Sequence, residues 1–338
     1  ETFETTVKRE VKEETGLDVT NIQYYGNQPW GFSGAQMIGF WAELTGSDQV
    51  KLQEEELKEA GWYTPEEIPP AYEENPLDLT HYMIEKNADA QAPWIIFTHG
   101  LCANHRLFDK QLPFFRLNYH VLLWDLPMHG RSRPYHAFTY AHAAEELKQI
   151  TDREHIKQAI LVGHGIGGYV CQEFASRWPE MVQAFVGVSA MPFGVALYPE
   201  FDQKELKTVP RTVKRLPERM LQTGLARKRT QTLYGYQNAL HMFEQMSKKE
   251  MVQAFAAAYG DRFTHKAVVQ FRCPVMLAIG AMDYTGKIAE YCRIWSEKQG
   301  YPMTVIPDAS HNANTDNADV FNDTVSKFLR RSLRKNKA

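Results

Sequence analysis

The predicted architecture follows from one stretch, Ala159-Ile-Leu-Val-Gly-His-Gly-Ile-Gly-Gly-Tyr169. Its apolar residues predict a short buried strand, the small residues after them predict a tight turn, and the following residues continue with helical spacing. A strand, a tight turn and a helix in this order are the context in which a Gly-x-Ser-x-Gly motif presents a nucleophilic serine. Here the motif reads Gly163-His-Gly-Ile-Gly167, so the nucleophile position holds Gly165, which has no reactive side chain.

Short apolar runs alternate with helical patterns through the second part of the chain. Continuous apolar strands separated by helices predict an α/β fold, in which a mostly parallel sheet is covered by helices on both faces. In such a sheet the chemistry gathers at the carboxyl ends of the strands. A long, largely helical insert rich in Lys and Arg, about residues 191–272, is expected to form a cap over these ends. The predicted strands cover residues 94–97, 121–124, 159–162, 184–188, 275–279 and 303–306.

Candidate functional residues follow five of these six strands. A His-Gly turn follows the first strand, an Asp-x-Pro-x-His-Gly-x-Ser motif the second, the glycine turn the third, Asp283 the fifth and His311 the last. In this order and register, residues 94–338 resemble the α/β-hydrolase family over nearly their whole length. The resemblance implies that His311 is a general base, that Asp283 orients it, and that the N–H groups of Leu101 and Ile166 form an oxyanion hole. It also implies a small ester or acyl substrate and no cofactor.

The glycine at the nucleophile position limits what such a site can do. Removing the nucleophile of a triad costs on the order of a million-fold in turnover, and about a thousand-fold acceleration over water survives. We therefore expect acyl hydrolysis by this chain to be absent or strongly impaired. As substitutes, Ser132 is expected to pack under the site and Cys171 to lie in the helix beyond the turn, whereas Cys102 could reach the pocket.

Two other functions are compatible with the same residues. In one, the chain is a non-catalytic relative whose capped pocket binds an apolar ligand or a partner. In the other, His311 acts as a base on a bound substrate without a serine. The acid and histidine favour a hydrolase, because a binding protein needs neither. A dinucleotide site at the Gly-x-Gly-x-x-Gly run 163–168 is disfavoured, because this run follows a middle strand and Val188 stands where such sites place an acid.

Three glutamates near the start of the chain suggest a metal site. Glu10, Glu13 and Glu14 are separated by three and four residues, so they share one face of a predicted helix that ends at Gly16. Carboxylates crowded in this way are suitable ligands for a hard cation such as Mg²⁺ or Mn²⁺. A solvated acidic face without a metal is the alternative.

Residues 1–17 resemble the Nudix box, because Glu1, Arg9 and the three glutamates stand at the spacing of that motif. The resemblance implies hydrolysis of a nucleoside diphosphate derivative. It also implies that Mg²⁺ or Mn²⁺ is held by the three glutamates, which Arg9 orients.

Residues 27–35 resemble the motif that marks the NADH pyrophosphatases among the Nudix hydrolases. This resemblance implies substrate contacts by Gln28, Trp30 and Phe32, with core packing as the alternative for the two aromatic residues. Glu56 stands where relatives often carry another metal-binding acid, and a solvated helix explains it equally well.

The sequence therefore predicts two domains. Residues 1–86 are assigned to a partial Nudix domain that ends in a helix at 79–86, residues 87–93 to a linker, and residues 94–338 to an α/β-hydrolase domain. The chain starts inside a helical pattern and lacks the glycine and the strands that normally precede the box. We expect residues 1–86 alone to be poorly folded, because a half-complete sheet leaves an unpaired edge and an open core.

Composition excludes several classes of protein. The 338 residues are 43% hydrophobic and 23% charged, which is typical of a globular chain, and the net charge of −3 argues against charge-driven binding of nucleic acid. No apolar run is long enough to span a membrane. The four cysteines show neither CxxC pairs nor zinc spacing, so we expect reduced thiols and a cytoplasmic protein.

Overall fold

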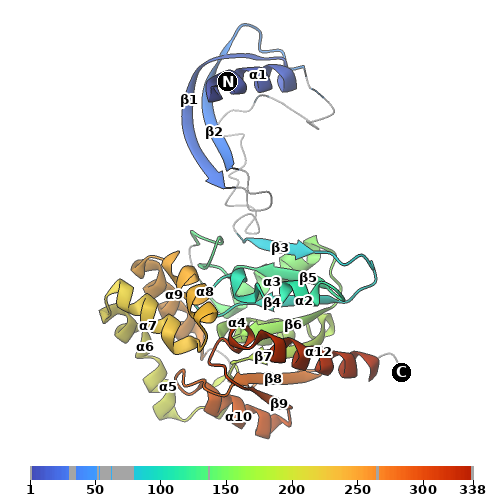
Figure 1. Cartoon of the computed structure of the whole chain (residues 1–338), viewed down its shortest axis with the longest axis vertical. Coiled ribbons are helices and arrows are strands. Elements are labelled where there is room, and N and C mark those ends of the chain that lie inside the picture. The colour runs from blue at the N-terminus through green and yellow to red at the C-terminus, as the bar shows by residue number, and fades with distance from the viewer. Residues whose placement is uncertain are drawn as a thin grey trace. The chain divides into compact units, whose positions relative to one another are not determined.

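The computed structural model describes residues 2–29, 36–51, 53, 62, 80–135, 138–263 and 266–335. The chain divides into two compact units, Glu1–Ala71 and Tyr72–Ala338, which are described one at a time (Figure 1).

The first unit contains a helix and a two-stranded antiparallel sheet. These elements are α1 (Phe3–Thr15), β1 (Asp18–Pro29) and β2 (Gln36–Thr45). The Thr2 side chain accepts the N–H of Thr5 at the start of α1, which satisfies one of the free donors of the first turn. The helix ends at Gly16, whose φ of 73° is the left-handed conformation that glycine adopts without strain.

No hydrophobic side chain is buried among the described residues of this first unit. Large apolar side chains are instead exposed, including Phe3 at 63%, Tyr25 at 70% and Trp41 at 66%. That residues 1–86 fold poorly on their own remains a prediction.

The second unit is built on a seven-stranded sheet with the order β3-β5-β4-β6-β7-β8-β9, in which β3 is Tyr82–Glu85. The six strands expected from the sequence are all present, and neighbouring strands among them are parallel. β5 and β6 are buried along their whole length, as expected for strands covered on both faces. The bounds are β4 (Trp94–Thr98), β5 (His120–Trp124), β6 (Ala159–His164), β7 (Val182–Val188), β8 (Val275–Gly280) and β9 (Met303–Ile306).

The seventh strand corrects the prediction for residues 79–93. Tyr82–Glu85 form β3, which pairs antiparallel with β5, so the expected helix at 79–86 is wrong. Residues 87–93 connect β3 to β4 within one sheet and are therefore not a linker between domains. The physical reason is that β5 would otherwise present an unpaired edge, and the Tyr-Met-Ile-Glu sequence of β3 suits a half-buried edge strand.

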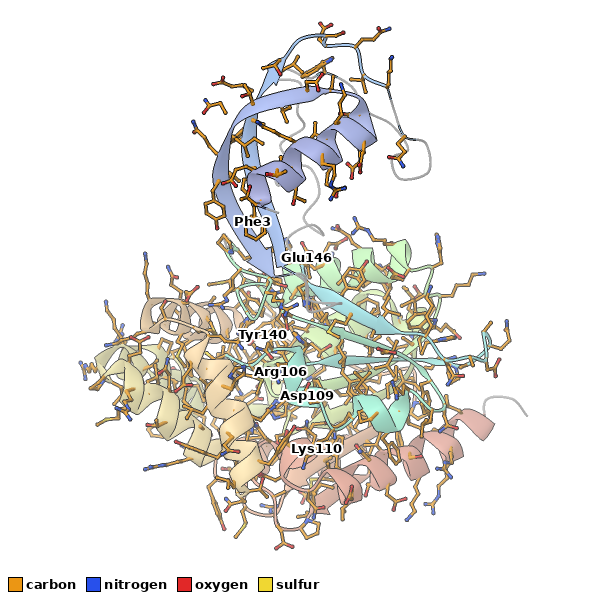
Figure 2. The ribbon with its side chains drawn as sticks, turned by 45° about the horizontal axis from the view of Figure 1, so that its top comes forward. Phe3, Arg106, Asp109, Lys110, Tyr140 and Glu146 are labelled. Carbon is orange, nitrogen blue, oxygen red and sulfur yellow. The ribbon has the colours of Figure 1, made fainter. Side chains whose placement is uncertain are left out.

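Two hydroxyl groups donate to Glu146 of α3 (Tyr140–Arg153), and one of them, that of Thr80, belongs to the segment before β3. The Thr80 hydroxyl donates to Glu146 Oε2 at 2.7 Å, and the Tyr135 hydroxyl donates to Glu146 Oε1 at 2.6 Å. Glu146 and Tyr140 both belong to α3 and are buried (Figure 2). A buried carboxylate needs such donors, so Glu146 fixes where the chain enters the sheet.

Helices pack beside the sheet and also form the expected cap region. Five helices lie between residues 191 and 272 and gather at one side of the sheet (Figure 1). These are α5 (Glu200–Leu206), α6 (Val209–Arg215), α7 (Glu218–Arg229), α8 (Leu233–Glu244) and α9 (Lys248–Asp261). The other helices are α2 (Leu112–Phe115), α3 (Tyr140–Arg153), α4 (Ile166–Arg177), α10 (Ile288–Gln299), α11 (Ala313–Asp316) and α12 (Ala318–Lys335).

Candidate active site

The turn between β6 and α4 has the geometry of a nucleophile elbow. β6 ends at His164, Gly165 has φ 52° and ψ −117°, and α4 begins at Ile166. The flanking glycines are sterically required, because a Cβ atom on Gly163 would lie 2.6 Å from the Cα of Gly168. Gly165 differs, since the nearest atom to a Cβ placed there is Nε2 of His311 at 3.5 Å, an ordinary contact distance.

His311 and Asp283 form the pair expected from the sequence. Asp283 follows β8, His311 follows β9, and the His311 Nδ1 atom lies 3.1 Å from Asp283 Oδ2. Both side chains are buried. With Nδ1–H donating to the carboxylate, the Nε2 atom is left to face the elbow at Gly165. This is the orientation in which an imidazole can take a proton from a residue at position 165.

The carboxyl group of Asp283 is held in its ionised form. Burial alone raises its pKa, but the charge and hydrogen bond of His311, with the N–H of Thr285, outweigh burial and hold the pKa well below its usual range. An ionised carboxylate at this position stabilises the imidazolium that forms during proton transfer.

The predicted oxyanion residues lie beside this pair. Leu101 and Ile166 line the same cavity as Gly165 and His311. Ile166 is the first residue of α4, so its N–H has no partner within the helix and is available to an anion. The turn at Leu101 is fixed from the cap, because Nη1 of Arg229 donates to the Leu101 carbonyl at 2.7 Å.

Arg229 connects three parts of the site. It is the last residue of α7, its side chain holds the Leu101 turn, and its own carbonyl accepts the N–H of Asn312 at 2.8 Å. Asn312 follows His311 directly, so one cap residue positions both the oxyanion turn and the histidine loop. The sequence showed only that this insert is rich in Lys and Arg.

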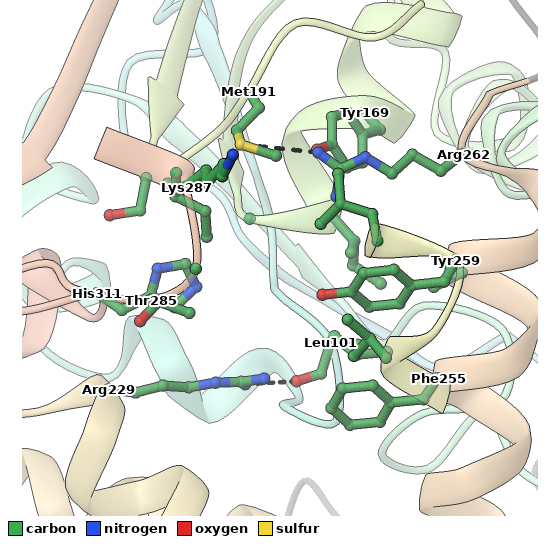
Figure 3. Close-up of a pocket in the computed structure, with 18 of the residues that line it drawn as sticks. Leu101, Tyr169, Met191, Arg229, Phe255, Tyr259, Arg262, Thr285, Lys287 and His311 are labelled. Atoms are coloured by element: carbon green, nitrogen blue, oxygen red, sulfur yellow. Dashed lines mark hydrogen bonds between the residues drawn. The ribbon is translucent and has the colours of Figure 1, made fainter. Parts of the chain in front are cut away.

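The cavity over the elbow has a volume of about 260 Å³. Apolar and aromatic side chains from the cap and α4 form much of its wall, as Figure 3 shows for Tyr169, Phe255 and Tyr259. A small, mostly apolar cavity with a few polar groups is the usual form of a small-molecule site.

The substitute nucleophile considered from the sequence is not supported. Cys102 is fully buried, and burial raises the pKa of its thiol to about 12. It is also absent from the residues that line the cavity. The Cys171 thiol lies against the Thr98 hydroxyl, and burial raises its pKa as well. The Ser132 hydroxyl donates to the Asp125 carbonyl. A protonated, enclosed thiol is a poor nucleophile.

Three buried imidazoles lie at or after the carboxyl ends of β4, β5 and β6. Burial lowers the pKa of His99 to about 4 and that of His129 to about 3, and it lowers the pKa of His164 well below the usual value. His164 Nε2 lies 3.0 Å from the His311 carbonyl, so its neutral ring supports the histidine loop. These residues are therefore neutral supports at physiological pH.

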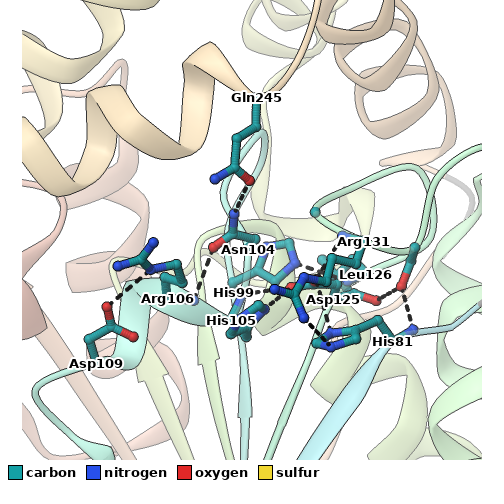
Figure 4. Close-up of polar contacts among 12 residues, drawn as sticks. His81, His99, Asn104, His105, Arg106, Asp109, Asp125, Leu126, Arg131 and Gln245 are labelled. Atoms are coloured by element: carbon teal, nitrogen blue, oxygen red, sulfur yellow. Dashed lines mark hydrogen bonds and ion pairs between the residues drawn. The ribbon is translucent and has the colours of Figure 1, made fainter. Parts of the chain in front are cut away.

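A polar cluster at the start of β3 was not anticipated. Asp125 is buried, and its two oxygens accept the backbone N–H groups of His105 at 2.7 Å and Arg131 at 2.8 Å. The Nδ1 atoms of His105 and His81 lie 2.8 and 3.2 Å from the same carboxylate (Figure 4). The Asp-x-Pro-x-His-Gly motif contains Asp125, but its histidine partners come from distant segments that no local pattern connects.

The Nudix carboxylates lie on one helix, as predicted. Arg9 pairs with Glu10 at 2.6 Å and with Glu13 at 3.0 Å, and its role in orienting metal ligands stays a prediction. Among the described residues, the donor atoms that converge as a metal would require belong to His81, His105 and Asp125, and the α1 glutamates form no such group. The expected Mg²⁺ or Mn²⁺ site at Glu10, Glu13 and Glu14 is thus not complete in the described part of the chain.

The predicted nucleotide contacts cannot be placed. Trp30, Phe32 and Glu56 lie outside the described residues. Gln28 is in β1, where its backbone is paired opposite Met37, and its side chain is outside the description.

The sheet, the elbow and the acid–histidine pair define a hydrolase of the α/β class. The family described as "alpha/beta hydrolase fold" matches residues 93–318, so the chain belongs to that family. A second family match, described as a NUDIX domain, covers residues 1–83. Both predicted resemblances are thereby confirmed.

Solved structures support the fold of the second unit. A hydrolase from Pseudomonas aeruginosa PA01 superposes with a TM-score of 0.63 at 19% identity, covering 74% of this chain and 94% of that one. A thermophilic esterase from Thermogutta terrifontis superposes with a TM-score of 0.61 at 16% identity, covering 75% and 93%. At these identities the likeness shows the fold alone.

The chain is also similar to a curated Nudix hydrolase. The NAD-capped RNA hydrolase NudC of Mannheimia succiniciproducens is 44% identical over 106 residues, which is 31% of this chain and 35% of that relative. The chain thus spans about a third of the length of that relative. Separately, none of the helices in the described ranges is long and apolar enough to cross a membrane.

Proposed function

We propose that the second unit is a serine-hydrolase-type acyl hydrolase site that lacks its nucleophile. The observation that carries this proposal is the position of His311, whose Nε2 would lie 3.5 Å from a Cβ at Gly165 while Nδ1 contacts Asp283. The protein is therefore expected to bind a small ester or acyl substrate and to turn it over at or near background.

The chemistry follows when a serine occupies position 165. The serine oxygen attacks the acyl carbonyl while Nε2 of His311 takes its proton, and Asp283 stabilises the imidazolium. The N–H groups of Leu101 and Ile166 stabilise the negative charge on the carbonyl oxygen. The histidine then returns the proton to the leaving alcohol, and water releases the acyl group by the same steps. With Gly165, no oxygen stands at the attacking position.

The test compares hydrolysis of p-nitrophenyl acetate and butyrate by three proteins: the chain itself, Gly165→Ser, and Gly165→Ser with His311→Ala. We expect Gly165→Ser to raise the rate at least about a thousand-fold over the chain and His311→Ala to remove that gain. A Gly165→Ser protein that is folded and stays at background would refute the proposal.

A non-catalytic ligand-binding role is the second candidate. It is favoured by one observation, namely that the cavity is retained while the reactive side chain is absent. Saturable binding of a small ligand, together with no gain from Gly165→Ser, would identify this role. Proton abstraction from a bound substrate that needs His311 but no serine would instead identify base catalysis.

For the first unit, we infer Mg²⁺- or Mn²⁺-dependent hydrolysis of a nucleoside diphosphate derivative in a protein that supplies a complete site. The NUDIX match and the identity to NudC support this inference. Glu10, Glu13 and Glu14 are the carboxylates that would hold the metal. The test is hydrolysis of NADH and of an NAD-capped oligonucleotide with Mg²⁺ or Mn²⁺, using Glu13→Gln as the variant. Metal-dependent turnover unaffected by Glu13→Gln would contradict the assignment.

A further inference from the structure

The cavity over the elbow carries more positive than negative side chains. Its wall includes one carboxylate, that of Glu205, and four cationic side chains, which are those of Lys228, Arg229, Arg262 and Lys287. Lys287 is already paired, since its Nζ lies 2.6 Å from Asp202. The two arginines form no ion pair with any carboxylate in the described ranges.

Arg262 is buried without a counter-charge. It caps the end of α9 and is only 6% exposed. Its guanidinium lies 5.2 Å from the ring centre of Tyr169 and 5.3 Å from that of Tyr198. Its Nη2 has two long contacts, to Met191 Sδ at 3.6 Å and to the Tyr198 hydroxyl at 3.5 Å, and its buried Nε has no partner.

Arg229, on the other side of the cavity, also has a hydrogen-bond donor without a partner. It is also 6% exposed, and its Nη1 is used by the Leu101 carbonyl, whereas its buried Nε has no partner. Figure 3 shows the Arg229 guanidinium beside Leu101 and the Arg262 side chain extending toward Tyr169 and Met191. The two cations therefore line different parts of the cavity.

A guanidinium keeps its charge in a protein, and burying it without an anion is unfavourable. Its planar fork of donors matches a carboxylate, and aromatic rings around it exclude water and strengthen the contact. Nothing in the described chain supplies the anion, and the cavity is open to a small ligand. A small ligand with a negative group of its own would both fit the cavity and supply the missing anion.

We propose that this cavity binds acyl substrates that carry a carboxylate of their own, such as half-esters of short dicarboxylic acids, with Arg262 as the principal anion-binding residue. The proposal rests on the proposed acyl hydrolase function, which places the reacting ester group at the elbow. The volume of about 260 Å³ suits a short acyl chain between the elbow and the cation. Arg229 adds positive potential next to the oxyanion turn.

The first experiment measures binding and needs no catalysis. Isothermal titration of the chain as it stands with glutarate and with its neutral dimethyl ester compares ligands of similar shape and different charge. We expect glutarate to bind more tightly and Arg262→Met to weaken it by about tenfold or more, as loss of a charge-assisted hydrogen bond does. Arg227→Met, which removes an exposed arginine of α7, is the matched control and should leave binding unchanged.

The controls keep this test decisive. Should Arg262→Met fail to fold, Arg262→Lys retains the charge without the fork and is expected to weaken glutarate severalfold. Equal affinity for glutarate and its dimethyl ester, or an undiminished affinity in a folded Arg262 variant, overturns the proposal.

The second experiment separates this proposal from the function on which it rests. In Gly165→Ser, kcat/KM is compared for p-nitrophenyl butyrate and for the mono-p-nitrophenyl ester of glutarate. We expect the anionic ester to be preferred about tenfold and Arg262→Met to remove the preference. If glutarate binds and neither ester is hydrolysed, the hydrolase function fails and the anion site stands. If p-nitrophenyl butyrate is hydrolysed, but the anionic ester is not preferred and glutarate does not bind, the proposed anion site is refuted and the hydrolase function stands.

Discussion

A Cβ atom at Gly165 would meet the Nε2 atom of His311 at 3.5 Å, with no closer neighbour. The same addition at Gly163 would bring backbone atoms within 2.6 Å, and at Gly167 it would collide with the carbonyl oxygen of Thr98. The elbow therefore has room for one side chain, and that side chain would face the base.

Room does not remove the backbone strain at this position. Gly165 has φ 52°, so Gly165→Ser and Gly165→Ala should each lower the free energy of unfolding by about 1–2 kcal/mol. Urea unfolding of both variants measures this. The control is Gly224→Ala in α7, where added atoms meet nothing within 4 Å, and a gain of about 0.5–1 kcal/mol is expected. Variants at position 165 as stable as the parent would show that the elbow relaxes.

Asp283 should matter for rate and not for binding. In the Gly165→Ser protein, Asp283→Asn removes the charge that stabilises the imidazolium and disturbs the tautomer, so kcat should fall by up to about ten-thousand-fold. Glutarate or ester affinity should change little, because Asp283 is not part of the cavity wall. Steady-state kinetics and titration of the same preparation check this. A fall in affinity that accounts for the whole loss would assign Asp283 a purely structural role.

The buried histidines should make the fold sensitive to mild acid. The pKa values of His99 (about 4) and His129 (about 3) lie below the ordinary value of about 6.5, so between these values the unfolded chain binds more protons. Stability is therefore full above pH 6.5 and falls as pH drops. The expected slope is about 1.4 kcal/mol per pH unit for each histidine.

Urea unfolding from pH 7 to pH 4.5 measures this slope. His129→Phe should reduce it by about 1.4 kcal/mol per pH unit, because one proton fewer is taken up on unfolding. His155→Asn is the matched control, since His155 is exposed and asparagine tolerates its φ of 55°. A slope that is the same in all three proteins would show that other groups set the acid response.

The start of the hydrolase unit can be tested by truncation. A chain that begins at Tyr72 keeps β3, whereas one that begins at Asn87 loses the pairing with β5 and the bond from Thr80 to Glu146. At about 1 kcal/mol for each hydrogen bond, we expect the shorter chain to be less stable by several kcal/mol and to aggregate through its open edge. Thermal unfolding and light scattering compare the two. Equal stability of the two chains would support a domain boundary after residue 86.

The sequence was sufficient for those features that depend on local pattern. The parallel strands are mostly apolar runs, and Asp283 and His311 come within a few residues of the last two, so a role for both can be predicted. The prediction of a helix at β3 is wrong because four half-buried residues carry no clear period, and only the unpaired edge of β5 makes them a strand. Arg229 and Arg262 could not be singled out, because exposed and buried arginines look alike in a basic insert.

The double attachment of Arg229 bears on how a ligand enters. The end of α7 is bonded to the oxyanion turn through a side chain and to the histidine loop through a backbone carbonyl. A cap that swung away as one rigid lid would pull on both loops and dismantle the reaction geometry with every opening. A ligand therefore has to enter without such a movement of the cap, which stays hydrogen-bonded to both loops that carry the reaction geometry.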